Sequence, residues 1–439
     1  MKISTLFCAL ALLAVTIAAE ASAEARAYIP HRTTVPQLAS NAEVIVVGQL
    51  DRVEDITLSV PGRDAAVHKR INDGSVQDGE DYVLREAVLT VNTILKQGAT
   101  AVGAELRFVS VRQLKLAAYD ADLRDGEAIY FLSRREDGRY AVHSDERGTV
   151  SVEEAAGDLN AVASFIKQHL TDDGASTAGI DRMLNAINLD GSRLSVDSAM
   201  ELSWFHESYV PFMNVEQRQR ILDLCKLSPP GSAERLQLLT AAGRHPADGA
   251  LEGLLEIMLS DPDWSTTSLA SMSLEYVDRG EAINRLLAEY EVATDTTVKT
   301  VIVRSLGLIR PKADYDGPAV RNDTLQIVNE LLVPGTDKGL LREALIASRD
   351  LRSGTAHVAN LKSMIENRET NGLTDTEIRG AIVALAAARG VDDDGKAVVL
   401  EEAFLKSLAE ADAYYKQFVD SAILFPYTSL IDGADGKGH

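Results

Sequence analysis

The sequence predicts an α+β protein of more than one domain, in which an antiparallel β-barrel or sandwich is followed by an α-helical solenoid. Three observations lead to this prediction. Strand-like runs joined by short turns occupy about residues 42–153, the apolar period becomes helical from about residue 155, and similar helix pairs then recur roughly every 40 residues. With 439 residues, the chain is long enough for two or more hydrophobic cores.

The N-terminal residues have the pattern of a signal peptide. Lys2 supplies a short positive start, an apolar run follows from Ile3 to about Ala19, and residues 21–23 (Ala-Ser-Ala) fit the small-x-small rule for signal peptidase. We therefore expect a Sec-type signal peptide over residues 1–23, cleaved after Ala23. Its short length and single basic residue are typical of bacteria, so we expect the mature chain in the periplasm or the medium.

The chain contains two cysteines, Cys8 and Cys225. Cys8 lies inside the signal peptide and follows Phe7, where a lipoprotein signal has a small residue, so we do not expect lipidation. Once Cys8 is removed, Cys225 has no partner for an intramolecular disulfide. It lies on the apolar side of a helical pattern, "RILDLCKLS", which favours a buried small hydrophobe over a reactive thiol.

Acidic residues outnumber basic ones by 66 to 44, which gives a net charge of −22. Nucleic acids and anionic lipids are bound by basic patches, so the composition argues against both as partners. It fits a basic partner or associated cations. After the signal peptide, no stretch approaches the ~20 apolar residues of a membrane helix, and we expect no integral membrane span.

Residues 27–153 are expected to form the β domain. Gly48, in the first strand-like run, marks a bend or bulge. Ile129–Ser133 and Tyr140–His143 are expected to pair as a hairpin around residues 136–138 (Glu-Asp-Gly). The expected strands lie within 43–53, 82–95, 104–114, 125–144 and 148–152.

Three of these runs, "LASNAEVIVVGQL", "VLTVNTILKQG" and "GEAIYFLSRREDGRYAV", resemble a domain found at the start of many exported bacterial proteins. That domain is similar to a small OB-type or netrin-like β-barrel, and the resemblance covers about 110 residues. Netrin-like protease inhibitors depend on cysteines near the N-terminus. The mature chain has none there, so the resemblance does not imply inhibition.

From about residue 155 onward the apolar residues follow helical spacing. The segment 159–170 predicts a first amphipathic helix. Four later segments resemble one another, and each opens with an aspartate at a plausible N-cap and follows another amphipathic helix. The four aspartates, at successive steps of 32, 42 and 38 residues, are Asp263, Asp295, Asp337 and Asp375.

These helix pairs resemble HEAT or armadillo repeats over about residues 212–424. A single pair cannot bury its apolar stripe, whereas stacked pairs can, so the resemblance implies a HEAT-like solenoid. An irregular bundle of the same helices is the alternative. We expect the polar, Gly-rich segment 61–81 to be a long mobile loop and the tail 425–439 to be flexible.

The stretch "SWFHESYVPFM" (203–213) gathers four aromatic residues in a chain that is 5% aromatic. Trp204, Phe205, Tyr209 and Phe212 would lie on roughly one side of a helix. We interpret them, with the connecting helices of 155–211, as a packed seam between the β domain and the helical array. A protein-binding hot spot is one alternative.

A catalytic site is the other alternative for this stretch. His206, Glu207 and Tyr209 are its candidate residues, although adjacent residues on a helix point about 100° apart and do not face each other. The chain has no HExxH zinc helix, Gly-x-Ser-x-Gly elbow, phosphate-binding glycine loop or Cys-based metal pattern. No two histidines are three or four residues apart, the spacing that places two imidazoles on one helical face.

Three acidic stretches are candidates for calcium binding. Asn188, Asp190, Gly191 and Asp197 match an EF-type loop in part, but Ala186 stands where the first ligand belongs. The stretch 260–264 is better explained as an inter-helix turn, and 391–395 as a solvated loop. We therefore expect no cofactor and no metal site, and we keep a calcium-stabilised envelope protein as an alternative.

The function predicted from the sequence is that of an exported, non-enzymatic binding or scaffold protein. It would recognise a protein or peptide through the helical-repeat surface. Lys299, Arg342 and Arg379 recur in three of the repeated segments, and we expect them on the binding face, although pairing with aspartates of neighbouring repeats would also explain them. The alternative function is an enzyme with a site in the inter-domain cleft near Trp204.

Overall fold

The computed structural model describes residues 33–58, 82–111, 123, 126–134, 138–143, 147–172, 175–391 and 397–424. The predicted signal peptide, the predicted loop 61–81, residues 392–395 of the third acidic stretch and the tail 425–439 lie outside these residues. The chain divides into two compact units, Met1–Phe212 and Met213–His439, which are described separately.

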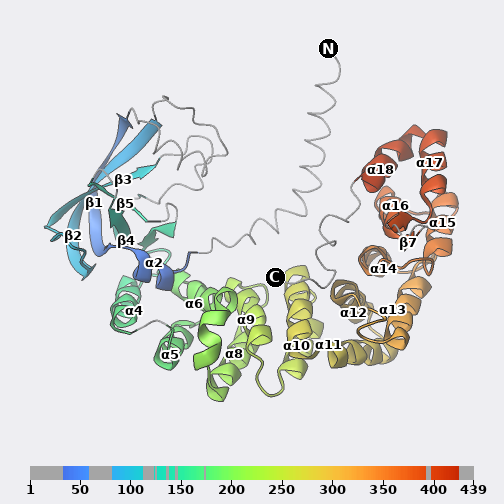
Figure 1. Cartoon of the computed structure of the whole chain (residues 1–439), viewed down its shortest axis with the longest axis horizontal. Coiled ribbons are helices and arrows are strands. Elements are labelled where there is room, and N and C mark those ends of the chain that lie inside the picture. The colour runs from blue at the N-terminus through green and yellow to red at the C-terminus, as the bar shows by residue number, and fades with distance from the viewer. Residues whose placement is uncertain are drawn as a thin grey trace, which may run out of the picture. The chain divides into compact units, whose positions relative to one another are not determined.

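The first unit contains a closed five-stranded β-barrel (Figure 1). The first strand pairs with both the second and the fourth, which closes the sheet, and a sixth strand extends from the fourth. All pairs are antiparallel except β3–β5, which is parallel. In ring order the strands are β1 (Val44–Leu58), β2 (Tyr82–Lys96), β3 (Glu105–Val111), β5 (Tyr140–Val142) and β4 (Glu127–Arg134), with β6 (Thr149–Ser151) beside β4.

The predicted α+β fold class is confirmed, with a barrel rather than a sandwich and one parallel pair in place of a wholly antiparallel sheet. The predicted hairpin is β4–β5, in which Leu132 lies opposite Val142. Gly48 lies at a register shift between β1 and β2, as expected for a bulge. A Cβ on Gly48 would lie 2.5 Å from the carbonyl oxygen of Thr90, so the two strands approach there only because residue 48 has no side chain.

Alternate residues of the strands fill the barrel interior, including Val44, Leu89, Phe108 and Tyr130. Ile45 and other residues of opposite orientation are also buried, because short helices cover part of the outer surface. Two of these, α2 and α4, pack against each other, and α2 also packs on α6. The helices of this unit are α2 (Val35–Asn41), α4 (Leu159–Thr171), α5 (Thr177–Ala186), α6 (Arg193–Trp204), α7 (His206–Tyr209) and the 3-10 turn η3 (Val210–Phe212).

The second unit consists of consecutive helix pairs, which Figure 1 shows following one another in chain order. The second helices of successive pairs pack on one another: α9 on α11, α11 on α12, α12 on α14, α14 on α16 and α16 on α18. Asp278 has non-helical backbone angles, so α11 is two helices joined at a kink. The helices are α8 (Val215–Leu227), α9 (Ala233–Arg244), α10 (Ala250–Ser260), α11 (Trp264–Val292), α12 (Thr296–Ile309), α13 (Pro318–Leu331), α14 (Lys338–Leu351), α15 (Val358–Glu366), α16 (Asp375–Ala387), α17 (Glu402–Ala411) and α18 (Ala413–Leu424), with strands β7 (Arg389–Val391) and β8 (Ala397–Val399) between α16 and α17.

The predicted helix starts are confirmed at three of the four aspartates. Asp263, Asp295 and Asp337 are the N-caps of α11, α12 and α14, and each side chain accepts hydrogen bonds from backbone N–H groups of the first turn. The fourth prediction was wrong. Thr374 caps α16 in a capping box with Glu377, and Asp375 is the first helical residue. No helix in the described ranges combines the length and apolar character needed to cross a membrane.

Close helix contacts in the second unit depend on small residues. A Cβ on Gly307 of α12 would lie 2.8 Å from the Cα of Ala347 on α14, and one on Gly243 of α9 would lie 2.7 Å from the Cα of Ser273 on α11. These distances are below any real Cβ contact, so the backbones touch through glycine. The stacking of successive pairs is therefore set by residue size at these positions.

We predict that Gly307→Ala destabilises the protein by about 1–3 kcal/mol, because the new methyl group meets backbone atoms that cannot move without separating α12 from α14. Thermal unfolding of the full chain measures the effect. The matched control is Gly280→Ala in the second half of α11, where a Cβ would meet only the Asp278 carboxylate at 3.8 Å. That change should raise stability by about 0.5–1 kcal/mol through helix propensity. A higher melting temperature for both variants would contradict the close contact.

Candidate functional site

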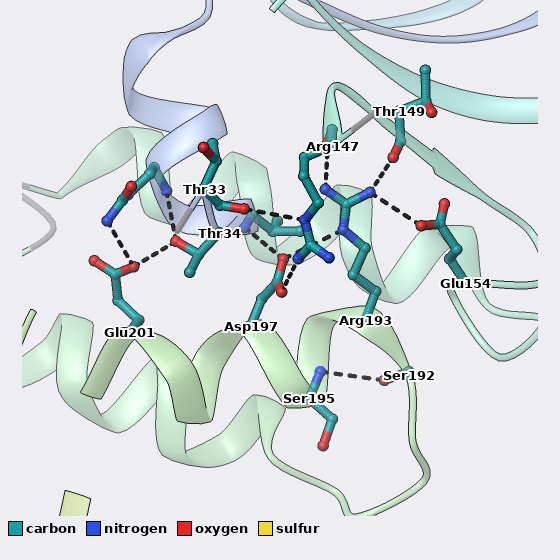
Figure 2. Close-up of polar contacts among 12 residues, drawn as sticks. Thr33, Thr34, Arg147, Thr149, Glu154, Ser192, Arg193, Ser195, Asp197 and Glu201 are labelled. Atoms are coloured by element: carbon teal, nitrogen blue, oxygen red, sulfur yellow. Dashed lines mark hydrogen bonds and ion pairs between the residues drawn. The ribbon is translucent and has the colours of Figure 1, made fainter. Parts of the chain in front are cut away.

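Charged and polar side chains from three parts of the first unit meet beside α6. Arg193, Asp197 and Glu201 lie four residues apart on α6, which places them along one side of the helix. Arg147 precedes β6, and Thr34 is the N-cap of α2. Figure 2 shows the Asp197 and Glu201 side chains pointing from α6 toward the start of α2. We call these five residues the buried ion cluster.

Asp197 is at the centre of the cluster and is 0% exposed. Its Oδ1 accepts a hydrogen bond from Arg147. Its Oδ2 accepts from the backbone N–H of Val35, at 2.9 Å, and from Nε of Arg193, at 3.4 Å. Removing a carboxylate from water costs several kcal/mol unless cations and donors compensate it, and here both are present.

Arg193 links α6 to the barrel. Its guanidinium donates to the backbone carbonyls of Thr149 and Arg147, and to the Glu154 carboxylate at 3.2 Å. Burial lowers the pKa of this guanidinium, and the Asp197 carboxylate opposes that effect. The contacts use several of the five N–H donors in a fixed planar geometry, which a lysine could not reproduce.

Glu201 holds α2 and α7. Its carboxylate accepts hydrogen bonds from the Thr34 hydroxyl at 2.5 Å, the Gln37 amide at 3.3 Å and the Tyr209 hydroxyl at 3.0 Å. Burial raises the pKa of the Glu201 carboxyl, while these three hydrogen bonds lower it. The donors and acceptors of the cluster are satisfied by the chain itself, so we assign it the role of fixing α2 and α7 on α6.

The aromatic stretch does not form the single helix expected from the sequence. α6 ends at Trp204, and a short α7 and the turn η3 follow. Tyr209 is buried, whereas Trp204 is 41% and Phe212 44% exposed, and Phe205 is half-buried. The one-sided arrangement was therefore wrong, because the chain changes direction after Trp204. The seam with the helical array stays a prediction.

The candidate catalytic residues lie in and around α7. His206 is half-buried and Glu207 is exposed. The Tyr209 hydroxyl donates to Glu201, and its pKa is raised by burial and by the Glu201 charge, so it stays protonated at neutral pH. Tyr209 thus has a structural role as a donor to Glu201 of the buried ion cluster.

The three basic candidates of the second unit lie on second helices of successive pairs. Lys299 on α12 is half-buried, and its ammonium lies 5.0 Å from the centre of the Tyr290 ring. Arg379 on α16 is also half-buried, with its guanidinium carbon 4.1 Å from the centre of the Phe418 ring. Arg342 on α14 is exposed. Within the described residues none of the three forms an ion pair, so the expected alternative of pairing with aspartates is not seen.

Sequence reasoning missed an exposed apolar stripe on α11. Trp264, Met272 and Tyr276 are 51%, 53% and 50% exposed, and their spacing of eight and four residues puts them on one side of the helix. The Arg244 guanidinium of α9 stacks on the Tyr276 ring at 3.9 Å. The sequence signal was present, because Trp264 follows the N-cap Asp263 and apolar residues recur at helical spacing, but that spacing alone does not show which side of the helix is exposed. We call these three residues the α11 stripe.

The first two of the three acidic stretches considered for calcium have other partners. Asp190 accepts a hydrogen bond from the backbone N–H of Ser192, and both oxygens of Asp197 are used in the buried ion cluster. Asp263 is an N-cap and Asp261 accepts from Thr266, as expected for an inter-helix turn. Among the described residues no group of three or more His, Cys, Asp or Glu side chains is placed to hold a metal ion.

Cys225 and His357 are buried in the second unit. Burial raises the pKa of the Cys225 thiol to about 12, which makes it unreactive. His357 is 0% exposed; its Nε2–H donates to the Leu325 carbonyl at 2.9 Å, and its Nδ1 accepts from the Ser348 hydroxyl at 2.7 Å. Burial lowers the pKa of His357 to about 4. The neutral ring therefore joins α13, α14 and the start of α15.

We predict that Asp197→Asn destabilises the first unit by about 3–5 kcal/mol, because Arg147 and Arg193 then lack their buried counter-charge. Hydrogen exchange at residues 35–41 should rise with it, since α2 loses an anchor. Glu207→Gln, at an exposed position of the same unit, makes the same carboxylate-to-amide change and should alter neither quantity. Unchanged exchange in α2 after Asp197→Asn would refute the role given to the cluster.

We predict that stability of the second unit falls on acidification, with His357 contributing roughly 3 kcal/mol to the fall. The neutral ring is favoured by the fold, so its contribution is complete above the ordinary pKa of 6.5 and is lost as pH falls from there toward about 4. His357→Gln should lower stability at pH 7 and flatten the decline between pH 6.5 and 4. Unfolding curves of the two proteins over this range measure the difference, and parallel declines would exclude His357 as the cause.

The sequence matches no model of a known protein family, and a search of curated proteins finds no significant relative. Inference about function therefore depends on the chain's own residues.

Proposed function

We propose that this chain is an exported binding or scaffold protein that recognises a protein or peptide partner through the surface of its second unit. The α11 stripe is the observation that carries the proposal. Trp and Tyr are the residue types most enriched at binding hot spots, and Met adapts to different partner shapes. Three large apolar side chains left half-exposed along one helix are more than the scattered exposed residues normal for a protein surface.

The other elements support this proposal. Consecutive helix pairs agree with the HEAT-type resemblance, and such arrays present long surfaces to extended partners. The five-stranded barrel agrees with the OB-type resemblance. The signal-peptide pattern of residues 1–23 supports export. Arg342, exposed on α14, is the basic candidate best placed to meet a partner, because Lys299 and Arg379 lie over rings of their own chain.

We predict that Trp264→Ser/Met272→Ser/Tyr276→Ser weakens partner binding by at least about tenfold, since each hot-spot residue is worth about 1–2 kcal/mol. The full chain from Glu24 would be incubated with envelope extract, crosslinked and analysed by mass spectrometry. The affinity of the captured partner would then be measured for each variant. A second variant, Arg342→Glu, tests the basic candidate in the same assay.

The control is Val215→Ser/Leu227→Ser/Val292→Ser, which removes three other large side chains that are 66%, 73% and 71% exposed in the same unit. It should bind the partner as the wild type does. Equal affinity for the stripe variant and the control would remove the stripe from the proposal. Absence of any reproducible partner for the wild type would overturn the proposed function itself.

A further inference from the structure

A groove lies between the second half of α11 and α13. Its volume is about 350 Å3, and it is open to solvent on one side. Leu287, Tyr290 and Ile327 supply apolar and aromatic lining, with Ile327 buried and the other two half-buried. The rest of the lining consists of the exposed carboxylates Glu291, Asp323 and Glu330, together with Ala288 and Gln326. We call this the acidic groove.

The carboxylates of the groove differ from those of the buried ion cluster. Within the described residues, none of the three forms an ion pair with a lysine or arginine of the chain; the Gln326 amide donates to Glu330 at 2.8 Å. An unpaired carboxylate is tolerated at the surface because water solvates it. The groove therefore presents negative charge that the fold itself does not neutralise.

The Tyr290 ring already binds one cation. The Lys299 ammonium lies 5.0 Å from the ring centre, within the range of a cation–π interaction. Lys299 belongs to α12 and is not among the residues that line the groove. The pKa of the Tyr290 hydroxyl is raised by burial and by the charges of Glu330 and Glu291, which places both carboxylates in the electrostatic environment of the ring.

An aromatic ring with carboxylates around it suits a long cationic side chain. The apolar stem of lysine or arginine can lie on Leu287 and Ile327 while the charged end reaches the ring or a carboxylate. A metal ion fits less well, because these carboxylates do not converge as a group of three metal ligands. The net charge of −22 also favours the approach of a basic segment over an acidic one.

We propose that the acidic groove receives a lysine or arginine side chain from an extended basic segment of the binding partner. This proposal rests on the proposed function, which it deepens by naming the chemistry of the partner. The groove and the α11 stripe are both on α11, on either side of the kink at Asp278. They differ in chemistry, since one offers charge and the other apolar area.

The test uses the full chain from Glu24 and two labelled decapeptides, one alternating Arg and Ala and the other alternating Glu and Ala, with fluorescence anisotropy as the readout. The basic peptide should bind with an affinity that falls as salt rises, and the acidic peptide should not bind. Glu291→Gln/Asp323→Asn/Glu330→Gln should weaken the basic peptide at least about tenfold. Tyr290→Leu, which leaves the charge unchanged, should weaken it about threefold to tenfold.

A matched control separates a local site from the general acidity of the chain. Glu252→Gln/Glu366→Gln/Glu410→Gln changes the net charge equally at exposed positions on α10, α15 and α17, and should change affinity less than about twofold. Lys299→Met should tighten binding, since it removes a cation from the Tyr290 ring. Lys338→Met, at an exposed lysine on α14, should have a smaller effect.

Equal losses in the groove variant and the control variant would overturn the groove as a site, because binding would then follow net charge alone. No binding of the basic peptide by a folded wild type, checked by its melting curve, would also overturn it. The proposed function is tested separately. If the groove variant captures a partner normally, the proposed function stands and the groove is not needed for it. If the wild type binds the basic peptide but captures no partner, the groove stands as a site and the proposed function is overturned.

Discussion

The first unit depends on the burial of one charge, that of Asp197. A carboxylate with no exposed surface is stable only if cations and donors surround it, and these come from three places: Arg193 on its own helix, Arg147 before β6, and the backbone of Val35 at the start of α2. If any one of these elements detached, the Asp197 carboxylate would stay buried without its full set of cations and donors. The barrel, α2 and α6 are therefore fixed to one another by the same group, and Glu201 extends the arrangement to α7 through Tyr209.

The second unit is held together differently, by contacts between neighbouring pairs. Gly307 and Gly243 allow close backbone approach, and ion pairs such as Arg304–Glu343 and Arg279–Asp316, each at 2.9 Å, join one pair to the next. Because each contact reaches only a neighbour, no single buried group fixes the whole array. The outer sides of the helices are then free to carry residues that the fold does not require, such as those of the α11 stripe.

Sequence pattern predicted what depends on local chemistry. Alternating strands, the Gly48 bulge, the β4–β5 hairpin and three aspartate caps follow from residues close together in the chain. The short helix α2 was missed, although Thr34 as N-cap and Pro36 in the first turn are ordinary start signals.

The buried ion cluster could not be predicted, because Arg193, Asp197 and Glu201, spaced four residues apart, would also be expected on the solvent-exposed side of a helix. Their partners are up to 167 residues away. For the same reason Asp197 was considered as a calcium ligand.

The distribution of negative charge supports the proposed position of a partner site. Because Asp197 and Glu201 are buried, cations and hydrogen-bond donors of the chain itself must stabilise their carboxylates. Their hydrogen-bonding capacity is therefore used within the fold. Glu291, Asp323 and Glu330 are exposed and need no such partners within the fold, since a solvated carboxylate lowers the stability of the fold little. An exposed charge beside an aromatic ring keeps its interactions available, and a cation arriving from outside gains from both. A cation from a partner is therefore expected to bind where exposed carboxylates without ion-pair partners lie beside apolar side chains. The acidic groove combines these features.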